Sequence, residues 1–240
     1  QLEAAARRQQ DFVGNFTHEL KTPLTSIIGY ADMLRSYDLP AAERREAAEY
    51  IYREGRRLES LSLHLLDLLV LEKTECDLQP VQAEHLCAEV EQATGFLAKK
   101  YGVALSVRCQ PALILVEPTL VKTLLYNLVD NACKASTTGQ KVVLRGRMKD
   151  GRYELSVRDY GRGMAPEELS RITEPFYMVD KSRARSQGGA GLGLALCKRI
   201  AALHGSPLAF ASRPGEGTLA GFAAQLAPEK AGPPHEEVQP

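Results

Sequence analysis

The residues best suited to chemistry begin with a short run from His18 to Pro23. The run places an imidazole (His18), a carboxylate (Glu19) and a hydroxyl (Thr22) within about one and a half turns of a predicted helix. His18 lies off the apolar stripe of that helix, and Thr22, four residues on, shares its face. Pro23 should bend the helix because it removes one backbone donor. Each residue alone is most often solvated or structural, so the meaning of the run depends on the rest of the chain.

Two amides on a second predicted helix suggest a metal and phosphate site. Asn127 and Asn131 are four residues apart and therefore project from one helix face, and Lys134 follows three residues later. Amide oxygens are hard ligands that suit Mg²⁺, which takes further oxygens from water and phosphates. A nearby lysine would neutralise phosphate charge. The pair therefore suits Mg²⁺ bound together with phosphates; alone, such a pair is more often a surface feature.

An acidic residue beside two glycines follows a predicted strand. Gly161 and Gly163 permit a close approach of the backbone, and the carboxylate of Asp159 can accept a hydrogen bond from an amino group such as adenine N6. An ordinary turn would have the same composition. Thr218, which follows the tight turn Gly215-Glu216-Gly217, begins the last predicted strand.

A glycine-rich loop leads into a third predicted helix and contains Gly189, Gly191, Leu192 and Gly193. Such a helix N-terminus is suited to anions, because its backbone N–H groups lack partners within the helix. The loop is not a Walker motif, since no Gly-Lys-Ser/Thr sequence follows.

Two long helices must position the His18 run. Residues from about 1 to 37 and from about 41 to 72 carry apolar residues at spacings of three and four. Two such helices cannot bury both apolar stripes as an isolated hairpin, whereas two chains forming a four-helix bundle would bury them. The alternative is a monomeric hairpin packed on the rest of the chain.

The remaining motifs require a second domain of different character. We expect the helical hairpin at 1–74, a linker at 75–80, a second domain at 81–227 and a disordered Pro- and Glu-rich tail at 228–240. In the second domain, helices near 83–101, 117–136 and 190–204 accompany six predicted strands. These blocks predict an α+β chain whose second domain is a mixed sheet with helices on one face.

Composition narrows the function classes. The 240 residues include 30 basic and 30 acidic side chains, which does not favour nucleic-acid binding. The five cysteines are scattered without a CxxC pair, so we expect neither a disulfide nor a metal framework, and a reducing compartment. We find no apolar run long enough to cross a membrane and no signal peptide, and the chain opens within a helical pattern, so we expect a fragment of a longer protein.

Taken in order, the motifs resemble those of sensor histidine kinases over residues 10–226. The His18 run resembles the H-box, and the later stretches resemble the N, G1, G2 and G3 boxes of the Bergerat-type ATPase fold shared with gyrase, Hsp90 and MutL. Phe176 and Tyr177, after Glu174-Pro175, resemble the F-box. The resemblance implies an ATP-binding α/β sandwich after a dimeric four-helix-bundle stalk.

The resemblance also implies roles for individual residues. His18 would be phosphorylated at Nε2, with Glu19 accepting or orienting the imidazole proton. Thr22, within an ExxT pattern, would assist dephosphorylation of a response regulator. The nucleotide residues would be Asn127, Asn131 and Lys134 at Mg²⁺ and phosphate, Asp159 with Gly161 and Gly163 at adenine, and Phe176, Tyr177, Gly189, Gly191, Leu192, Gly193 and Thr218 around them.

Two positions depart from the pattern. Met178 stands where many relatives have an arginine, and we hypothesise that Lys181, Arg183 or Arg185 supplies the charge toward the γ-phosphate instead. Ala135 stands where relatives often have an aromatic residue, which should alter packing near the metal without removing a ligand.

The resulting functional hypothesis is a homodimeric histidine kinase. It would use ATP and Mg²⁺ to phosphorylate His18 and pass the phosphoryl group to an Asp of a response-regulator receiver domain. The kinase core would be cytoplasmic and would not contact a membrane itself. The full-length protein could carry a membrane anchor elsewhere. The alternatives are a non-kinase ATPase of the same superfamily and a catalytically silent dimeric scaffold that docks a regulator.

Overall fold

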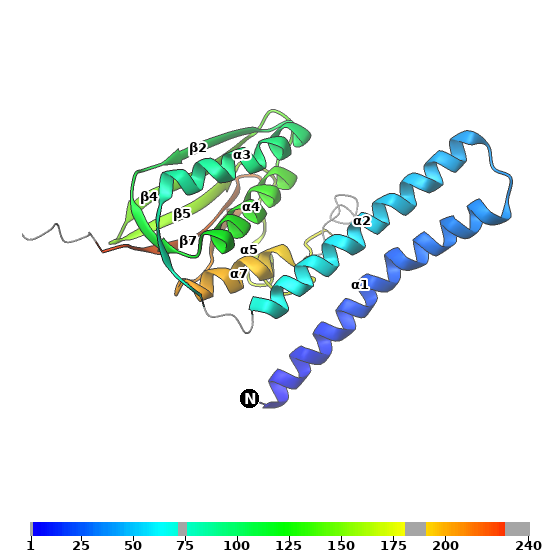
Figure 1. The fold of residues 1–240 in the computed structure, drawn as a ribbon, viewed down its shortest axis with the longest axis horizontal. Coiled ribbons are helices and arrows are strands. Elements are labelled where there is room, and N and C mark those ends of the chain that lie inside the picture. The colour runs from blue at the N-terminus through cyan, green and yellow to red at the C-terminus, as the bar shows by residue number, and fades with distance from the viewer. Residues whose placement is uncertain (1, 72–75, 181–190, 229–240) are drawn as a thin grey trace, which may run out of the picture.

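The computed structural model describes residues 2–71, 76–180 and 191–228. Helices α1 (Leu2–Ser36) and α2 (Ala41–Leu71) form an antiparallel hairpin, here called the stalk, whose turn projects away from the second domain (Figure 1). Helix α1 continues through Pro23, which is buried. Both helices end within one residue of the predicted bounds. Among the described residues, no helix combines the length and apolarity needed to cross a bilayer.

The second domain, here called the sheet domain, contains one mixed sheet. Its strands follow the path β1-β3-β7-β5-β4-β2, and β6 also pairs with β7. Every pairing is antiparallel except that of β2 with β4. The strands are β1 (Gln79–Gln82), β2 (Ala104–Cys109), β3 (Leu113–Val116), β4 (Lys141–Lys149), β5 (Arg152–Asp159), β6 (Ala209–Arg213) and β7 (Gly217–Leu226).

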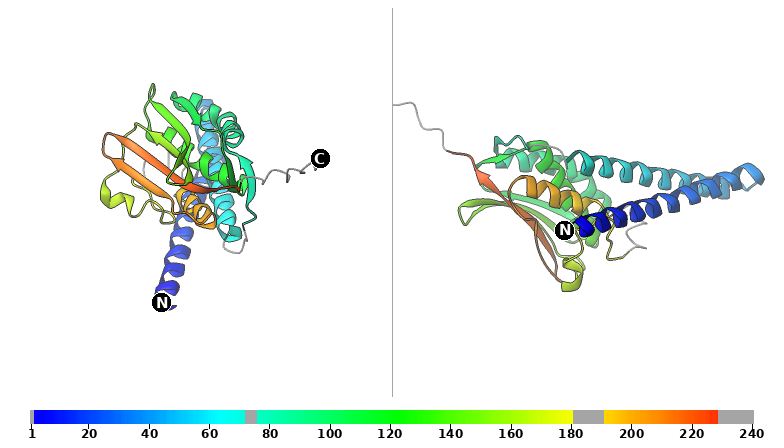
Figure 2. Two further views of the ribbon diagram at one scale, coloured as in Figure 1. Left: turned by 90° about the vertical axis from the view of Figure 1, so that its left-hand side faces the viewer. Right: turned by 90° about the horizontal axis from the view of Figure 1, so that it is seen from below.

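Three helices cover one face of this sheet, as Figure 2 shows. They are α3 (Ala83–Tyr101), α4 (Pro118–Ala135) and α7 (Gly193–Leu203). Helix α4 begins where Glu117 caps it, because the Glu117 carboxylate accepts hydrogen bonds from two backbone N–H groups and Pro118 needs none. The predicted α+β arrangement is confirmed. Two elements were not predicted: the short helix α5 (Pro166–Leu169), and β1, whose first two residues lie within the expected linker.

Two apolar clusters hold the fold together. The larger fills the space between the helices and the sheet, with Leu124, Leu144, Leu155 and Ile200 among its fully buried members. The smaller cluster joins the two domains. Leu61 of α2 packs there with Phe176 and Leu192 of the sheet domain, and the partly buried residues around them are Phe12, Phe16, Leu20 and Leu68. The stalk is therefore in direct contact with the sheet domain.

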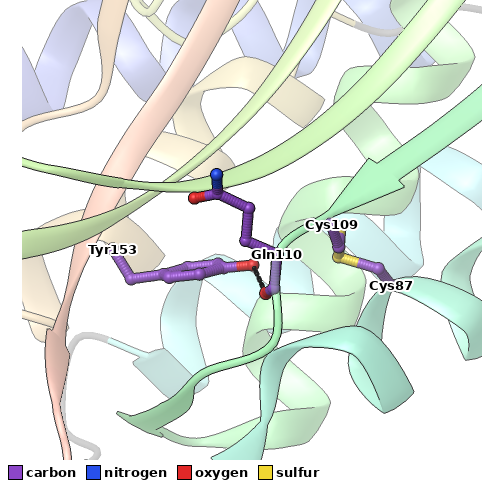
Figure 3. Close-up of a disulfide and its surroundings, with 4 residues drawn as sticks. All are labelled: Cys87, Cys109, Gln110 and Tyr153. Atoms are coloured by element: carbon purple, nitrogen blue, oxygen red, sulfur yellow. Dashed lines mark hydrogen bonds between the residues drawn. A yellow bond between two sulfur atoms is a disulfide. The ribbon is translucent and has the colours of Figure 1, made fainter.

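The expectation of unpaired cysteines is wrong. Cys87 of α3 and Cys109 at the end of β2 form a disulfide with a Cα–Cα distance of 6.8 Å (Figure 3). Beside it, the hydroxyl of the buried Tyr153 donates a hydrogen bond to the carbonyl of Gln110 (2.5 Å). The two cysteines are 22 residues apart and come together only because α3 packs on β2. The inference of a reducing compartment therefore loses its support.

Candidate active site

His18 lies on the outer surface of the stalk. Its side chain is 71% exposed, as its place off the apolar stripe predicts. Nδ1 lies 3.8 Å from an oxygen of Glu19. The hydroxyl of Thr22 lies over the preceding turn and donates a hydrogen bond to the His18 carbonyl oxygen (3.2 Å). The three residues of the run are therefore adjacent, with the imidazole accessible from outside.

The side chain of Glu19 is buried, whereas that of its neighbour His18 is exposed. Its second carboxylate oxygen accepts a hydrogen bond from Arg57 of α2 (2.6 Å), and the Arg57 side chain is only 6% exposed. Glu54 lies 3.7 Å from another terminal nitrogen of Arg57. Glu19 thus contacts His18 with one oxygen and ties the two stalk helices with the other. From the sequence we expect only the first of these two contacts.

The sheet domain contains a cavity of about 390 Å³ beside α4. Most of the predicted nucleotide residues that the structure describes line this cavity. They are Asn127, Asn131, Lys134, Asp159, Gly163, Tyr177, Gly191, Leu192, Gly193 and Thr218. Gly161 and Phe176 lie beside it, whereas Lys181, Arg183, Arg185 and Gly189 fall outside the described residues. Residues far apart in the sequence therefore converge on one site.

The α4 side of the cavity carries the two amides and one ion pair. Asn127 donates to the carbonyl of Thr123 through its side-chain nitrogen (2.9 Å), so its amide oxygen is oriented away from that carbonyl. Lys134 pairs with Asp130 of the preceding turn at 2.6 Å, and both are partly buried. Oxygen ligands and a cation therefore lie along one face of α4, as the spacing predicted. Asp130 was not predicted, although it lies inside the same motif.

Asp159 is a buried carboxylate at the end of β5. One of its oxygens accepts backbone hydrogen bonds from Gly161 (2.9 Å) and Thr218 (3.2 Å). Burial raises the pKa of the Asp159 carboxyl above its usual range, and these two bonds oppose the rise. Both hydrogen bonds reach the same oxygen, so the other carboxylate oxygen is the one left to face a ligand in the cavity.

Two glycines are required by close contacts of the protein with itself. Gly163 has φ = 63°, and a Cβ there would lie 1.8 Å from the carbonyl oxygen of Arg213. A Cβ on Gly193 would lie 2.8 Å from the amide oxygen of Asn127. Gly193 therefore lets the first turn of α7 approach the Asn127 end of α4. The sequence predicts only that this glycine lies in a loop suited to anions.

The predicted F-box joins the cavity to the stalk. Phe176 is buried, and its ring centroid lies 5.3 Å from that of Phe12 and 6.4 Å from that of Phe16. Its neighbours Tyr177 and Met178 line the cavity, and the Arg171 guanidinium lies over the Tyr177 ring at 4.5 Å. Phe16 is two residues before His18. Helix α1, which carries the candidate acceptor, therefore contacts the segment that walls the cavity, although Phe16 and His18 lie on different faces of that helix.

Some cavity residues gave no usable signal in the sequence. Ser60 and His64 line the cavity from α2, in the other domain, and no motif of the sequence includes them. Arg162 and Met164 belong to the same loop as Gly161 and Gly163, so that motif contained them. Only an interdomain contact, which no local pattern predicts, brings Ser60 and His64 to the site.

Each of the two domains matches a known protein family. The HisKA family, described as the His Kinase A (phospho-acceptor) domain, matches residues 8–73. The HATPase_c family, described as the histidine kinase-, DNA gyrase B- and HSP90-like ATPase, matches residues 116–228. The first match covers His18 and the stalk, and the second covers α4, the glycine loops and the cavity. The chain therefore belongs to the histidine kinases.

Relatives and solved structures agree with this assignment. Sensor-like histidine kinase SenX3 of Mycolicibacterium smegmatis is 34% identical over 90% of this chain and 56% of that protein. The phosphate regulon sensor protein PhoR of Pseudomonas aeruginosa is 34% identical over 92% and 50%. The chain spans about half the length of these relatives. The histidine kinase ThkA in complex with response regulator protein TrrA has a similar fold, with a TM-score of 0.75 and 21% identity over 95% of this chain and 67% of that one. Full-length ShkA in complex with AMPPNP has a TM-score of 0.64 and 27% identity over 91% and 46%.

Proposed function

We propose that this chain is an ATP-dependent protein-histidine kinase that phosphorylates His18 and passes the phosphoryl group to an Asp of a response-regulator receiver domain. The observation that supports this most strongly is the joining of the two sites: the cavity walled by Tyr177 and Met178 contacts, through Phe176, the helix that carries an exposed His18. This contact holds the cavity segment against the helix that carries the acceptor, and phosphoryl transfer requires the bound nucleotide to be positioned against that histidine.

The cavity residues fit an adenine nucleotide with Mg²⁺. The Asp159 carboxylate oxygen that does not accept from Gly161 and Thr218 would accept a hydrogen bond from adenine N6. The Asn127 and Asn131 amide oxygens are suitable ligands for Mg²⁺. Bound Mg²⁺ supplies positive charge against the phosphate oxygens. Lys134 would add charge by turning from Asp130 toward the phosphates. The related ShkA was solved with AMPPNP, which supports a nucleotide in this cavity.

His18 has the surroundings of a nucleophile. A neutral imidazole attacks phosphorus through one nitrogen while the other keeps its proton. The Glu19 oxygen lies 3.8 Å from Nδ1, so a small rotation would let it accept a hydrogen bond from Nδ1–H and leave Nε2 as the attacking atom. The ion pair with Arg57 holds Glu19 in place for this role.

A homodimer would cover apolar side chains that the single chain leaves exposed on the stalk. Leu24 and Ile28 of α1 are 51% and 60% exposed, and Leu63 and Leu66 of α2 are each 57% exposed. A second copy of the hairpin would bury these groups as a four-helix bundle. Because ATP is the proposed substrate, we place the dimer in the cytoplasm.

The receiver domain would dock on the same stalk. ThkA, which has a similar fold, was solved in complex with the response regulator protein TrrA. For dephosphorylation of the regulator, Thr22 would release its bond to the His18 carbonyl and orient a water molecule. Thr22→Ala should keep autophosphorylation and lose regulator dephosphorylation. Loss of both activities would refute the separate role of Thr22.

Incubation with γ-labelled ATP and Mg²⁺ tests the kinase assignment. Wild type should acquire label that is labile to acid and stable to base, and His18→Gln should acquire none. Label on both proteins would move the acceptor elsewhere. Bound nucleotide without label on either would contradict the kinase and favour the scaffold.

A further inference from the structure

The nucleotide cavity has a wall that belongs to the stalk. Ser60 and His64 of α2 line it, whereas the other described lining residues belong to the sheet domain. The two residues are one helical turn apart and therefore lie on one face. Leu61 and Leu68 of the same helix belong to the apolar cluster that contains Leu192 at the start of α7, and Arg199 of α7 donates hydrogen bonds to the carbonyl of Leu71, so this part of α2 is held against α7.

The geometry of α4 shows which end of the cavity the stalk meets. At one end, the Ala135 carbonyl accepts a hydrogen bond from Arg162, beside the loop of Asp159. Asn127 lies eight residues earlier, which is about 12 Å along the helix axis, and contacts Gly193. Because Leu61 packs on Leu192, α2 lies at the Asn127 end, remote from the proposed adenine site.

The ring of His64 is oriented for a ligand. Its Nδ1 lies 2.7 Å from the carbonyl oxygen of Ser60, and since a carbonyl only accepts hydrogen bonds, Nδ1 carries a proton. The other nitrogen, Nε2, is then the one available to the cavity. A protonated imidazole would donate from Nε2 to a phosphate oxygen and add positive charge.

We propose that His64 is a stalk residue that binds the phosphate chain of the nucleotide held in the sheet domain, with Ser60 fixing its ring. This inference rests on the proposed function and extends its binding site across both domains. The contact exists only while α2 packs on α7. Nucleotide affinity therefore depends on the docking of the two domains as well as on the sheet domain alone.

Isothermal titration calorimetry on the whole chain tests this role, with Mg²⁺–ATP and adenosine as probes. His64→Ala should weaken ATP binding about tenfold, the usual effect of losing one charge-assisted hydrogen bond. It should leave adenosine binding unchanged, because adenosine has no phosphate. His64→Lys should restore most of the ATP affinity. His85→Ala is the matched control, since His85 is exposed on α3 and does not line the cavity.

Three results would overturn the proposal: wild-type ATP affinity in His64→Ala, an equal loss for adenosine and ATP, or a lysine variant as weak as the alanine variant. An equal loss for adenosine and ATP would mean that His64 only shapes the cavity and does not bind phosphate. If wild type itself bound no ATP, the proposed function would fail together with this inference. ATP binding that is insensitive to His64 would refute this inference alone.

Discussion

The ion pair between Glu19 and Arg57 should contribute strongly to stalk stability, and Arg57→Met tests this. At 2.6 Å and an effective dielectric constant of about 20, the Coulomb attraction is about 6 kcal/mol. Burial of both groups offsets part of it, but removing only the arginine leaves a buried carboxylate without that partner. Such a change costs about 3–5 kcal/mol. Glu54 adds to the penalty, because it also loses a cation 3.7 Å away.

Urea unfolding followed by helical circular dichroism measures this loss, at one fixed protein concentration because subunit association contributes to stability. The control is Arg56→Met, which removes an exposed ion pair with Glu59 on the same helix and should cost less than about 1 kcal/mol. Glu19→Leu combined with Arg57→Met should recover much of the stability, since the buried Glu19 carboxylate is no longer left without the arginine. Equal losses for Arg57→Met and Arg56→Met, or additive losses in the double variant, would refute the reasoning.

Three further changes test other parts of the structure. Asp159→Asn should weaken ATP binding about tenfold in calorimetry because it replaces the proposed N6 acceptor; unchanged affinity would exclude that role. Burial lowers the pKa of His204 below 6.5, and its Nε2 accepts a backbone N–H, so protonation opposes folding. Relative to His204→Gln, wild type should lose stability as pH falls below 6.5, by up to about 1.4 kcal/mol per pH unit, and parallel profiles would contradict this. Of Lys181→Ala, Arg183→Ala and Arg185→Ala, at least one should slow phosphotransfer, and three unimpaired variants would reject a lid charge at the γ-phosphate.

Most of the fold could be predicted because its elements carry strong local signals. The helical periods of α1, α2 and α4 span many turns, and Asn127 and Asn131 lie on one of these helices, so their common face followed from spacing alone. Strand β1 was missed because Gln79-Pro80-Val81-Gln82 has few β-forming residues and contains a proline. Proline is tolerated there because β1 is an edge strand that, among the strands the structure describes, pairs with β3 alone.

What sequence reasoning missed depends on contacts between distant segments. Arg57 reaches Glu19 across the hairpin, 38 residues away, so the second role of Glu19 had no local signal. The pairing of Cys87 with Cys109 likewise requires α3 to pack on β2. His64 enters the cavity only through the docking of two domains, which neither domain's motifs encode.

The most direct test of the central claim is to locate phosphate on the chain by mass spectrometry after incubation with Mg²⁺–ATP. Wild type should carry it on the peptide that contains His18. Asn131→Ala should carry none while keeping its circular dichroism spectrum, because the cavity would lose its metal ligand. Two results would contradict the claim that nucleotide bound in this cavity phosphorylates His18. One is wild-type phosphorylation of His18 in Asn131→Ala, and the other is phosphate only at another residue of wild type.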